Sequence, residues 1–331
     1  MAHVTAVVSQ KGGVGKTTTA ANLAAALAAV GQNVLLLEVD PQGALIPSLG
    51  LHPEEIPHSL VDILEGKIEA REAVVRTPFE GLSLLAACLP HQDELILEDA
   101  ASRHPLHLRE VVDKLVPHFD SILLDGPPTL GHLARMTLAA SDGYLVPVQA
   151  EELSYRTLAR FLSVADSVQA DYNPDLKCDG ILITMADLRT RMAVKVVNQL
   201  HEHYGDKLLV SMVPRTVTLQ EMPDRGKPAL LYAPSSRGAE SYREVAEELL
   251  SNRDNPTEEE FDDALDLMDQ LTEDSTLLAE SPEPWLERAA SPPTTAELLQ
   301  NSSLFLTHLG WDPDREERPV RRPPGDDVSL R

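Results

Sequence analysis

Residues 9–18 read Ser-Gln-Lys-Gly-Gly-Val-Gly-Lys-Thr-Thr, a combination of glycines, lysines and threonines suited to holding phosphate. Glycines let consecutive backbone N–H groups converge on an anion, and the N-terminus of a following helix adds partial positive charge. Lys16 is expected to bridge the β- and γ-phosphates of a nucleotide, and the Thr17 hydroxyl to ligate Mg²⁺. The residues expected to surround the phosphates are Gly12, Gly13, Val14, Gly15, Lys16, Thr17 and Thr18.

This stretch departs from the standard phosphate-loop pattern, G-x-x-x-x-G-K-[ST], at two positions. Anchored on Gly15, the pattern asks for glycine at position 10, where the chain has Gln10. The chain also carries a second lysine, Lys11, which the pattern does not require. The alternative is a glycine turn with an incidental Gly-Lys-Thr. An apolar strand pattern before the loop and a helical pattern after it favour a phosphate loop.

Two carboxylates follow other predicted strands. The segment Leu-Leu-Leu-Glu-Val-Asp-Pro-Gln-Gly ends a strand at Glu38 and places Asp40 on the loop beyond it, and Ile-Leu-Leu-Asp-Gly-Pro-Pro ends a strand at Asp125. Open parallel sheets bind ligands outside the carboxyl ends of their strands. Asp125 is therefore expected to hold Mg²⁺ through water. Asp40 is expected to reach the same metal site and to orient the water that attacks the γ-phosphate. For each aspartate, a turn or helix cap remains the alternative.

Short apolar runs alternate with helical patterns over the first 250 residues, which predicts an α/β fold of the P-loop NTPase type. The strands are apolar throughout, as in a mostly parallel sheet covered by helices on both faces. Expected strands are 4–9, 34–38, 82–86, 121–125, 144–148, 180–184 and 208–212. Expected helices are 17–30, 106–116, 130–140, 154–169, 192–204 and 238–251.

Composition narrows the class of protein. Hydrophobic residues make up 43% of the 331 residues and aromatic residues 4%, so the core must consist mainly of Ala, Val, Leu and Ile. Cys88 and Cys178 belong to no C-x-x-C pair, which argues against a structural zinc site or a disulfide framework. The sequence has no signal-peptide pattern and no apolar run near the roughly 18 residues of a spanning helix. These features predict a cytoplasmic location.

The net charge of −25 is unevenly distributed: −11 up to Arg253 and −14 from Asp254 onward. This change in charge, together with proline pairs and acidic clusters, predicts a nucleotide-binding domain over residues 1–252 and an acidic, largely disordered tail over 253–331. A capping box at Thr257 and apolar residues at helical spacing predict one short amphipathic helix near 257–272. Apolar islands at 285–286 and 304–306 leave open a second interpretation, in which tail segments fold on a partner.

Five segments carry a family resemblance: KGGVGKTT, DPQG, DGPP, ILITMAD and KPALLYAPSSRGAESY. In this order, over residues 1–250, they resemble the ParA branch of the ParA/MinD partition ATPases, which have a deviant Walker A motif. The resemblance implies a Mg²⁺-dependent ATPase that is slow without a partner. It also implies that Lys11 reaches across an ATP-bound homodimer to the partner's ATP, so that the expected catalytic set is Lys11, Lys16, Asp40 and Asp125. The segments 184–187 and 213–215, with Pro214 and Arg215, are expected to border the adenine.

The resemblance further implies a role in segregating or positioning a chromosome, a plasmid or a large cytoplasmic assembly. ATP-bound dimers of such proteins commonly bind DNA without sequence preference, and Arg189 and Arg191 match one such region. The protein is then expected at the nucleoid, released when a ParB-like or cargo-adaptor partner stimulates hydrolysis. The alternative is a nucleotide-gated adaptor with little hydrolysis, whose tail recruits partners. A metal-cluster carrier would need paired cysteines, which Cys88 and Cys178 do not supply.

The chain also departs from the family pattern. Glu38 stands where relatives usually have aspartate, which puts the hydrolysis rate in doubt, and Thr218 replaces a basic residue often found in relatives. A local basic patch could still bind DNA, or its members could be ordinary solvated helix charges: Arg189, Arg191, Lys195 and Arg225. MinD-like relatives end in a basic membrane-binding helix. The acidic tail here argues against membrane recruitment by that route.

Overall fold

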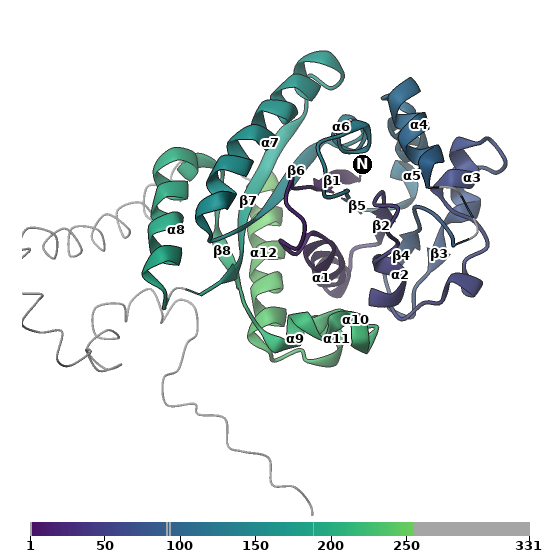
Figure 1. Cartoon of the computed structure of the whole chain (residues 1–331). Coiled ribbons are helices and arrows are strands. Elements are labelled where there is room, and N and C mark those ends of the chain that lie inside the picture. The colour runs from purple at the N-terminus through teal and green to yellow at the C-terminus, as the bar shows by residue number, and fades with distance from the viewer. Residues whose placement is uncertain (1, 91, 93, 188, 255–331) are drawn as a thin grey trace, which may run out of the picture. The chain divides into compact units, whose positions relative to one another are not determined.

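The computed structural model describes residues 2–254 apart from 91, 93 and 188. It confirms the predicted α/β class: one eight-stranded sheet has the order β3-β4-β2-β5-β1-β6-β7-β8 (Figure 1). The domain boundary predicted at residue 252 falls inside the last described helix, which ends at Asp254. The tail over 253–331, its helix near 257–272 and its apolar islands lie outside the described residues except for positions 253 and 254, so these remain predictions.

All neighbouring strands are parallel except β3, which runs antiparallel to β4 at one edge. Strand β1 lies between β5 and β6 near the middle of the sheet. The strand bounds are β1 His3–Val7, β2 Val34–Glu38, β3 Val75–Arg76, β4 Leu82–Leu85, β5 Ser121–Asp125, β6 Gly143–Gln149, β7 Lys177–Ala186 and β8 Leu208–Pro214.

Helices cover both faces of the sheet, as predicted (Figure 1). On one face lie α1 Lys16–Ala29, α2 Leu45–Ser48, α9 Val217–Gln220, α10 Met222–Arg225, α11 Ala229–Tyr232 and α12 Arg237–Asp254. On the other lie α3 Leu60–Leu64, α4 Leu95–Arg103, α5 His107–Leu115, α6 His132–Ala139, α7 Glu152–Asp171 and α8 Arg191–Tyr204. None of these helices, within the described ranges, combines the length and the apolar character needed to cross a membrane.

The central strands are buried on both faces because their alternate residues enter different cores. In β2, Leu36 packs with α1 and α12, whereas Leu35 and Leu37 pack with α3 to α6. All three side chains are fully buried. A strand that is buried on both faces is apolar throughout. This explains why β2 lacks the alternation of apolar and polar residues that marks a half-exposed strand.

The predicted strands and long helices are present, with bounds shifted by up to a few residues. Sequence reasoning missed β3, the helices α3 and α4, and the very short helices α2, α9, α10 and α11. Four or five residues make little more than one helical turn, so they display no apolar periodicity in the sequence. Helix α4 turns only Leu97 and Ala101 into the core, which leaves too weak a pattern to recognise.

Candidate nucleotide site

Loops from five strands meet at the carboxyl edge of the sheet. Strand β1 pairs with β5 on one side and with β6 on the other. The strand order runs away from β1 in opposite directions on its two sides, toward β2 on one and toward β8 on the other. Such a switch point leaves a crevice outside the strand ends, where open α/β sheets bind their ligands. Gly126, directly after β5, allows the two central strands to come this close: a Cβ there would lie 2.5 Å from the Cγ1 atom of Val8.

The stretch from Val8 to Gly15 joins β1 to α1, as the phosphate-loop pattern requires. Gly13 and Gly15 have φ angles of 73° and 89°, in the left-handed region that favours glycine. A Cβ added to Gly12 or Gly13 would meet no atom within 4 Å, so the outer side of the loop is open. Gly15 caps α1, whose first turn therefore presents its N–H groups toward the crevice.

Lys16 is buried, and its side chain folds back under the loop. Its Nζ atom donates a hydrogen bond to the Lys11 carbonyl at 3.2 Å. Burial lowers the pKa of Lys16 below its usual range, while the carboxylates of Asp125 and Asp40 act in the opposite direction. The lysine is therefore held by the loop backbone, with two carboxylates nearby.

Asp125 and Glu38 are adjacent carboxyl groups at the ends of neighbouring strands. They are register partners on β5 and β2, and neither has any exposed surface. Burial raises the pKa of Asp125 to about 7 and that of Glu38 to about 8. The Thr17 hydroxyl opposes the shift at Asp125, yet neither Asp125 oxygen reaches a hydrogen-bond partner within the described residues. Unsatisfied buried carboxylate oxygens beside a threonine hydroxyl fit the oxygen ligands and retained waters that Mg²⁺ prefers.

Asp40 lies on the loop that follows β2, and this loop folds against the end of β5. The N–H groups of Val39 and Asp40 both donate to the Asp125 carbonyl, at 2.9 and 3.3 Å. The Asp40 Oδ1 atom accepts a hydrogen bond from the Gln42 N–H at 3.1 Å. Asp40 therefore forms the turn cap that was its alternative role. It also lies next to Asp125, so the two roles are compatible.

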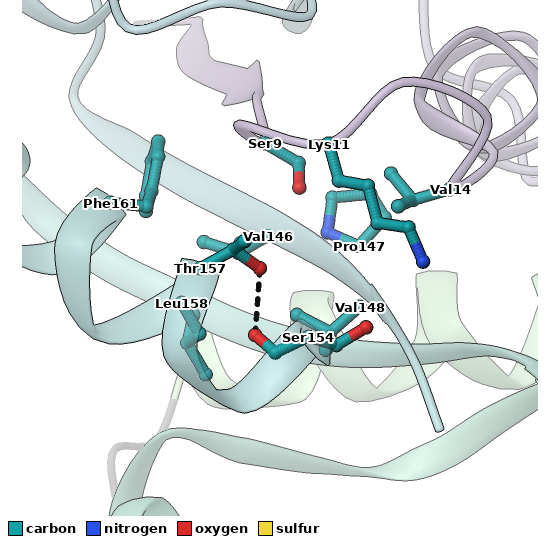
Figure 2. A pocket seen from close by; sticks show the side chains of 10 residues that line it. All are labelled: Ser9, Lys11, Val14, Val146, Pro147, Val148, Ser154, Thr157, Leu158 and Phe161. Carbon is teal, nitrogen blue, oxygen red and sulfur yellow. Dashed lines mark hydrogen bonds between the residues drawn. The ribbon is translucent and has the colours of Figure 1, made fainter. Parts of the chain in front are cut away.

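Lys11 is held within its own chain. Its Nζ atom lies 2.8 Å from Oε1 of Gln149, the last residue of β6, and 2.6 Å from Oε2 of Glu151, just beyond the strand. Figure 2 shows its side chain running past Pro147, above a small cavity lined by Ser154 among others. The ammonium group, expected to act on a partner's nucleotide, here has two partners in the same chain.

Gln149 connects three parts of the site. Besides accepting from Lys11, its side-chain Nε2 donates to the Gly13 carbonyl at 3.1 Å and contacts the Met185 Sδ atom at 2.8 Å. Sequence reasoning missed both Gln149 and Glu151. The signal was available, because they follow the carboxyl end of a predicted strand as Asp40 does.

The segments expected beside the adenine lie next to the phosphate loop. The Thr184 hydroxyl donates to the Val14 carbonyl at 2.8 Å, so β7 supports the loop directly. Pro214 is the register partner of Ala186 at the ends of β8 and β7, and Arg215 follows on the surface. These positions therefore lie at the same edge of the sheet as the phosphate loop. Their role toward a base remains a prediction.

The residues expected to bind DNA lie just beyond β7. Arg189 forms a two-pronged ion pair with Asp187, with N–O distances of 2.7 and 2.9 Å, and Arg191 begins α8 on the surface. Arg225 of α10 is paired with Glu221. At least two of the basic side chains considered for DNA therefore already have an acidic partner in the chain.

Comparison with known proteins agrees with this arrangement. The family model described as an AAA domain matches residues 2–178. The chain is 42% identical over 246 residues to the chromosome-partitioning ATPase Soj of Thermus thermophilus, covering 74% of this chain and 94% of that protein. It is 37% identical over 253 residues to the sporulation initiation inhibitor protein Soj of Bacillus subtilis, covering 76% and 100%.

Solved structures share the fold. A cobyrinic acid a,c-diamide synthase from Mycobacterium smegmatis with bound ADP and magnesium superimposes with a TM-score of 0.66 at 36% identity, covering 78% of this chain and 97% of that one. The cell division ATPase MinD of Pyrococcus furiosus gives a TM-score of 0.64 at 26% identity, covering 76% and 99%. Through these sequence and structural matches, the chain belongs to the ParA/MinD family of P-loop ATPases.

Proposed function

We propose that this protein is a partition or positioning ATPase that binds ATP and Mg²⁺ in the crevice at the carboxyl edge of its sheet. The observation that carries the proposal is the convergence of four side chains from three separate segments of the chain: Lys16, Thr17, Asp40 and Asp125. The matched relatives include proteins named for chromosome partitioning, which supports the same class of function.

In this proposal, the open glycine loop and the first turn of α1 donate backbone N–H groups to the phosphates. Lys16 leaves the Lys11 carbonyl and binds the β- and γ-phosphate oxygens. Thr17 would ligate the metal directly, and Asp125 would hold it through water. A bound Mg²⁺ neutralises charge on the β- and γ-phosphates. Asp40, on the adjacent loop, orients the water for attack on the γ-phosphate.

ATP then drives the formation of a homodimer in which Lys11 reaches the partner's phosphates. A second phosphate lysine is redundant within one chain, because Lys16 already lies under the loop. Across a dimer, the same cation would stabilise phosphate charge and join the two protomers. The ATP-bound dimer binds DNA non-specifically through Arg189 and Arg191. A ParB-like or cargo-adaptor partner stimulates hydrolysis and releases the protein from the nucleoid.

A single titration tests the proposal. DNA binding is measured with ADP, with ATP and with a slowly hydrolysed ATP analogue, at two salt concentrations. ATP hydrolysis is followed in the same samples. We expect binding with ATP and with the analogue but not with ADP, and a steep loss of affinity at the higher salt concentration. Equal DNA binding in all nucleotide states would refute the nucleotide switch. Nucleotide-dependent binding with no hydrolysis would favour the adaptor alternative.

A further inference from the structure

We propose that Glu38 is a positioning residue, whose side chain closes the loop 39–44 and thereby fixes where the Asp40 carboxylate lies. This inference rests on the proposed ATPase function, because Asp40 is the group expected to orient the attacking water. Glu38 is fully buried at the end of β2, and its Oε1 atom is bonded to the backbone of its own chain. Its role is inferred from the contacts that the side chain makes within the chain.

The glutamate spans the loop from one end to the other. Its Oε1 atom accepts a hydrogen bond of 2.7 Å from the N–H of Leu45, the first residue of α2. Glu38 is the last residue of β2, so this one contact joins the residues immediately before and after the loop that carries Asp40. The backbone of the loop is held at a second point, where Val39 and Asp40 donate to the Asp125 carbonyl.

Both residues of the Glu38–Leu45 hydrogen bond belong to buried parts of the structure. Glu38 pairs with Asp125 near the centre of the sheet and is fully buried. Leu45 and Leu49 are also fully buried, in and just after α2. The chain after α2 packs tightly against the end of α10: a Cβ on Gly50 would lie 2.7 Å from the Gly226 carbonyl oxygen. A loop that is anchored at both ends in buried structure has little freedom to move its carboxylate.

The length of the side chain matters for this contact. Aspartate, the residue usual in relatives, is shorter by one methylene, which withdraws the carboxylate by roughly 1.5 Å. The 2.7 Å bond to the Leu45 N–H would then be broken, or the loop would have to shift toward the strand. A misplacement of about 1 Å in a catalytic group can cost about 100-fold in rate. In this chain the length of the Glu38 side chain therefore matches the span of the loop, and aspartate at this position should disrupt the loop.

The test compares Glu38→Asp with the wild-type full chain. We expect kcat for ATP hydrolysis to fall about 10- to 100-fold, with nucleotide affinity within about twofold. In the background of Asp40→Ala, the same change should lower kcat no further, because the group it positions is gone. Glu248→Asp is the matched control: Glu248 also holds backbone N–H groups, those of Val210 and Ser211 at 2.7 and 2.9 Å, but on β8. This control should leave kcat unchanged.

Amide hydrogen exchange gives a readout that does not depend on activity. Glu38→Asp should accelerate exchange at Leu45 at least tenfold, while amides in the centre of β5 keep their protection. Unchanged exchange at Leu45 would overturn the proposal. So would wild-type kcat in Glu38→Asp, or an equal loss of kcat with and without Asp40. If wild type hydrolyses no ATP, the proposed function fails, and the exchange measurement still decides whether Glu38 holds the loop.

Discussion

The Lys11 ammonium lies 2.6 Å from the Glu151 carboxylate of the same chain. Their side chains are 25% and 54% exposed, so solvent screens the pair, and such surface ion pairs contribute about 0–1 kcal/mol. Triphosphate charge in a desolvated dimer interface is a much stronger partner for a cation. In the proposed ATP-bound dimer, Lys11 would leave this contact within one chain at little cost.

The two lysines of the loop should fail in different ways. Lys11→Ala should leave a folded protein that binds ATP with near wild-type affinity but stays monomeric. Lys16→Ala should weaken ATP binding roughly 100-fold or more, because it removes the cation nearest the phosphates. Sedimentation with saturating ATP, alongside nucleotide binding, measures both effects. Normal dimerisation of the Lys11 variant would exclude a role for that lysine across the dimer.

Removing the ion pair between Lys11 and Glu151 should favour the dimer slightly, provided that Glu151 does not itself contribute to the dimer interface. Glu151→Gln keeps a hydrogen-bond acceptor but removes the charge, so ATP-dependent dimerisation should strengthen by up to about fivefold, the equivalent of about 1 kcal/mol. Glu110→Gln is the control: Glu110 is an exposed glutamate of α5 that is paired with His104. Loss of dimerisation in Glu151→Gln would instead assign this carboxylate a role within the dimer interface.

Removal of the Asp40 carboxylate should trap the ATP-bound state. Asp40→Ala should lower turnover by about 10²- to 10⁴-fold, the range for loss of a group that handles the attacking water, while ATP affinity stays near wild type. Single-turnover hydrolysis and equilibrium binding separate these effects. Equal turnover in the variant and in wild type would move the role to another residue.

Stability should fall with rising pH in the protein free of nucleotide and metal. Burial raises the pKa of Asp125 from 3.8 to about 7 and that of Glu38 from 4.5 to about 8, so the folded state binds more protons than the unfolded state between those values. The stabilisation of the folded state by protons on these two carboxyl groups is complete below about pH 4. It is lost as the pH rises through 7 to 8, the pKa values in the folded state. Each kcal/mol lost lowers the Tm by about 2–4 °C.

Thermal unfolding between pH 6 and 8.5 measures this loss. The lowered pKa of Lys16 acts in the opposite direction, so the diagnostic comparison is with Asp125→Asn, which removes one carboxyl group and should flatten the profile. Added Mg²⁺ and nucleotide should flatten it as well, because a bound cation favours the charged carboxylate. A Tm that rises steadily over this range would contradict the prediction.

DNA binding should depend on Arg189 and should be weakened by the acidic tail. Arg189→Glu should reduce affinity at every salt concentration without changing ATP binding, whereas Arg71→Glu, exposed in the short turn Ala70–Ala73, should not. Deleting residues 257–331 should strengthen binding, most at low salt where screening is weak. A deletion that also removed Arg253 would mix the effect of the tail with a loss of stability, because Arg253 donates a hydrogen bond to the Thr5 hydroxyl of β1. Unchanged affinity at every salt concentration would exclude an electrostatic effect of the tail.

The local sequence was sufficient to predict seven of the eight strands, six of the longer helices and the glycine loop, whereas β3 and α4 were missed. The conformation of a glycine loop between an apolar strand and a helix can be predicted from local sequence. Glycine permits the left-handed turns, and the helix end supplies free N–H groups. Asp40 and Asp125 could likewise be predicted at the carboxyl edge, since Asp40 follows one parallel strand and Asp125 ends another. The very short helices were missed because they are held by packing against the core and carry no pattern of their own.

Only the tertiary structure decided which of these groups are neighbours. The β2–β5 register brings Glu38 beside Asp125, although 86 residues separate them in the sequence. The β1–β6 pairing brings Lys11 to Gln149 and Glu151. The side chain of Glu38, which by sequence differs from relatives only by a methylene, proved to span the loop to Leu45. Such contacts depend on strand order and on distances across the fold, which a pattern of neighbouring residues does not contain.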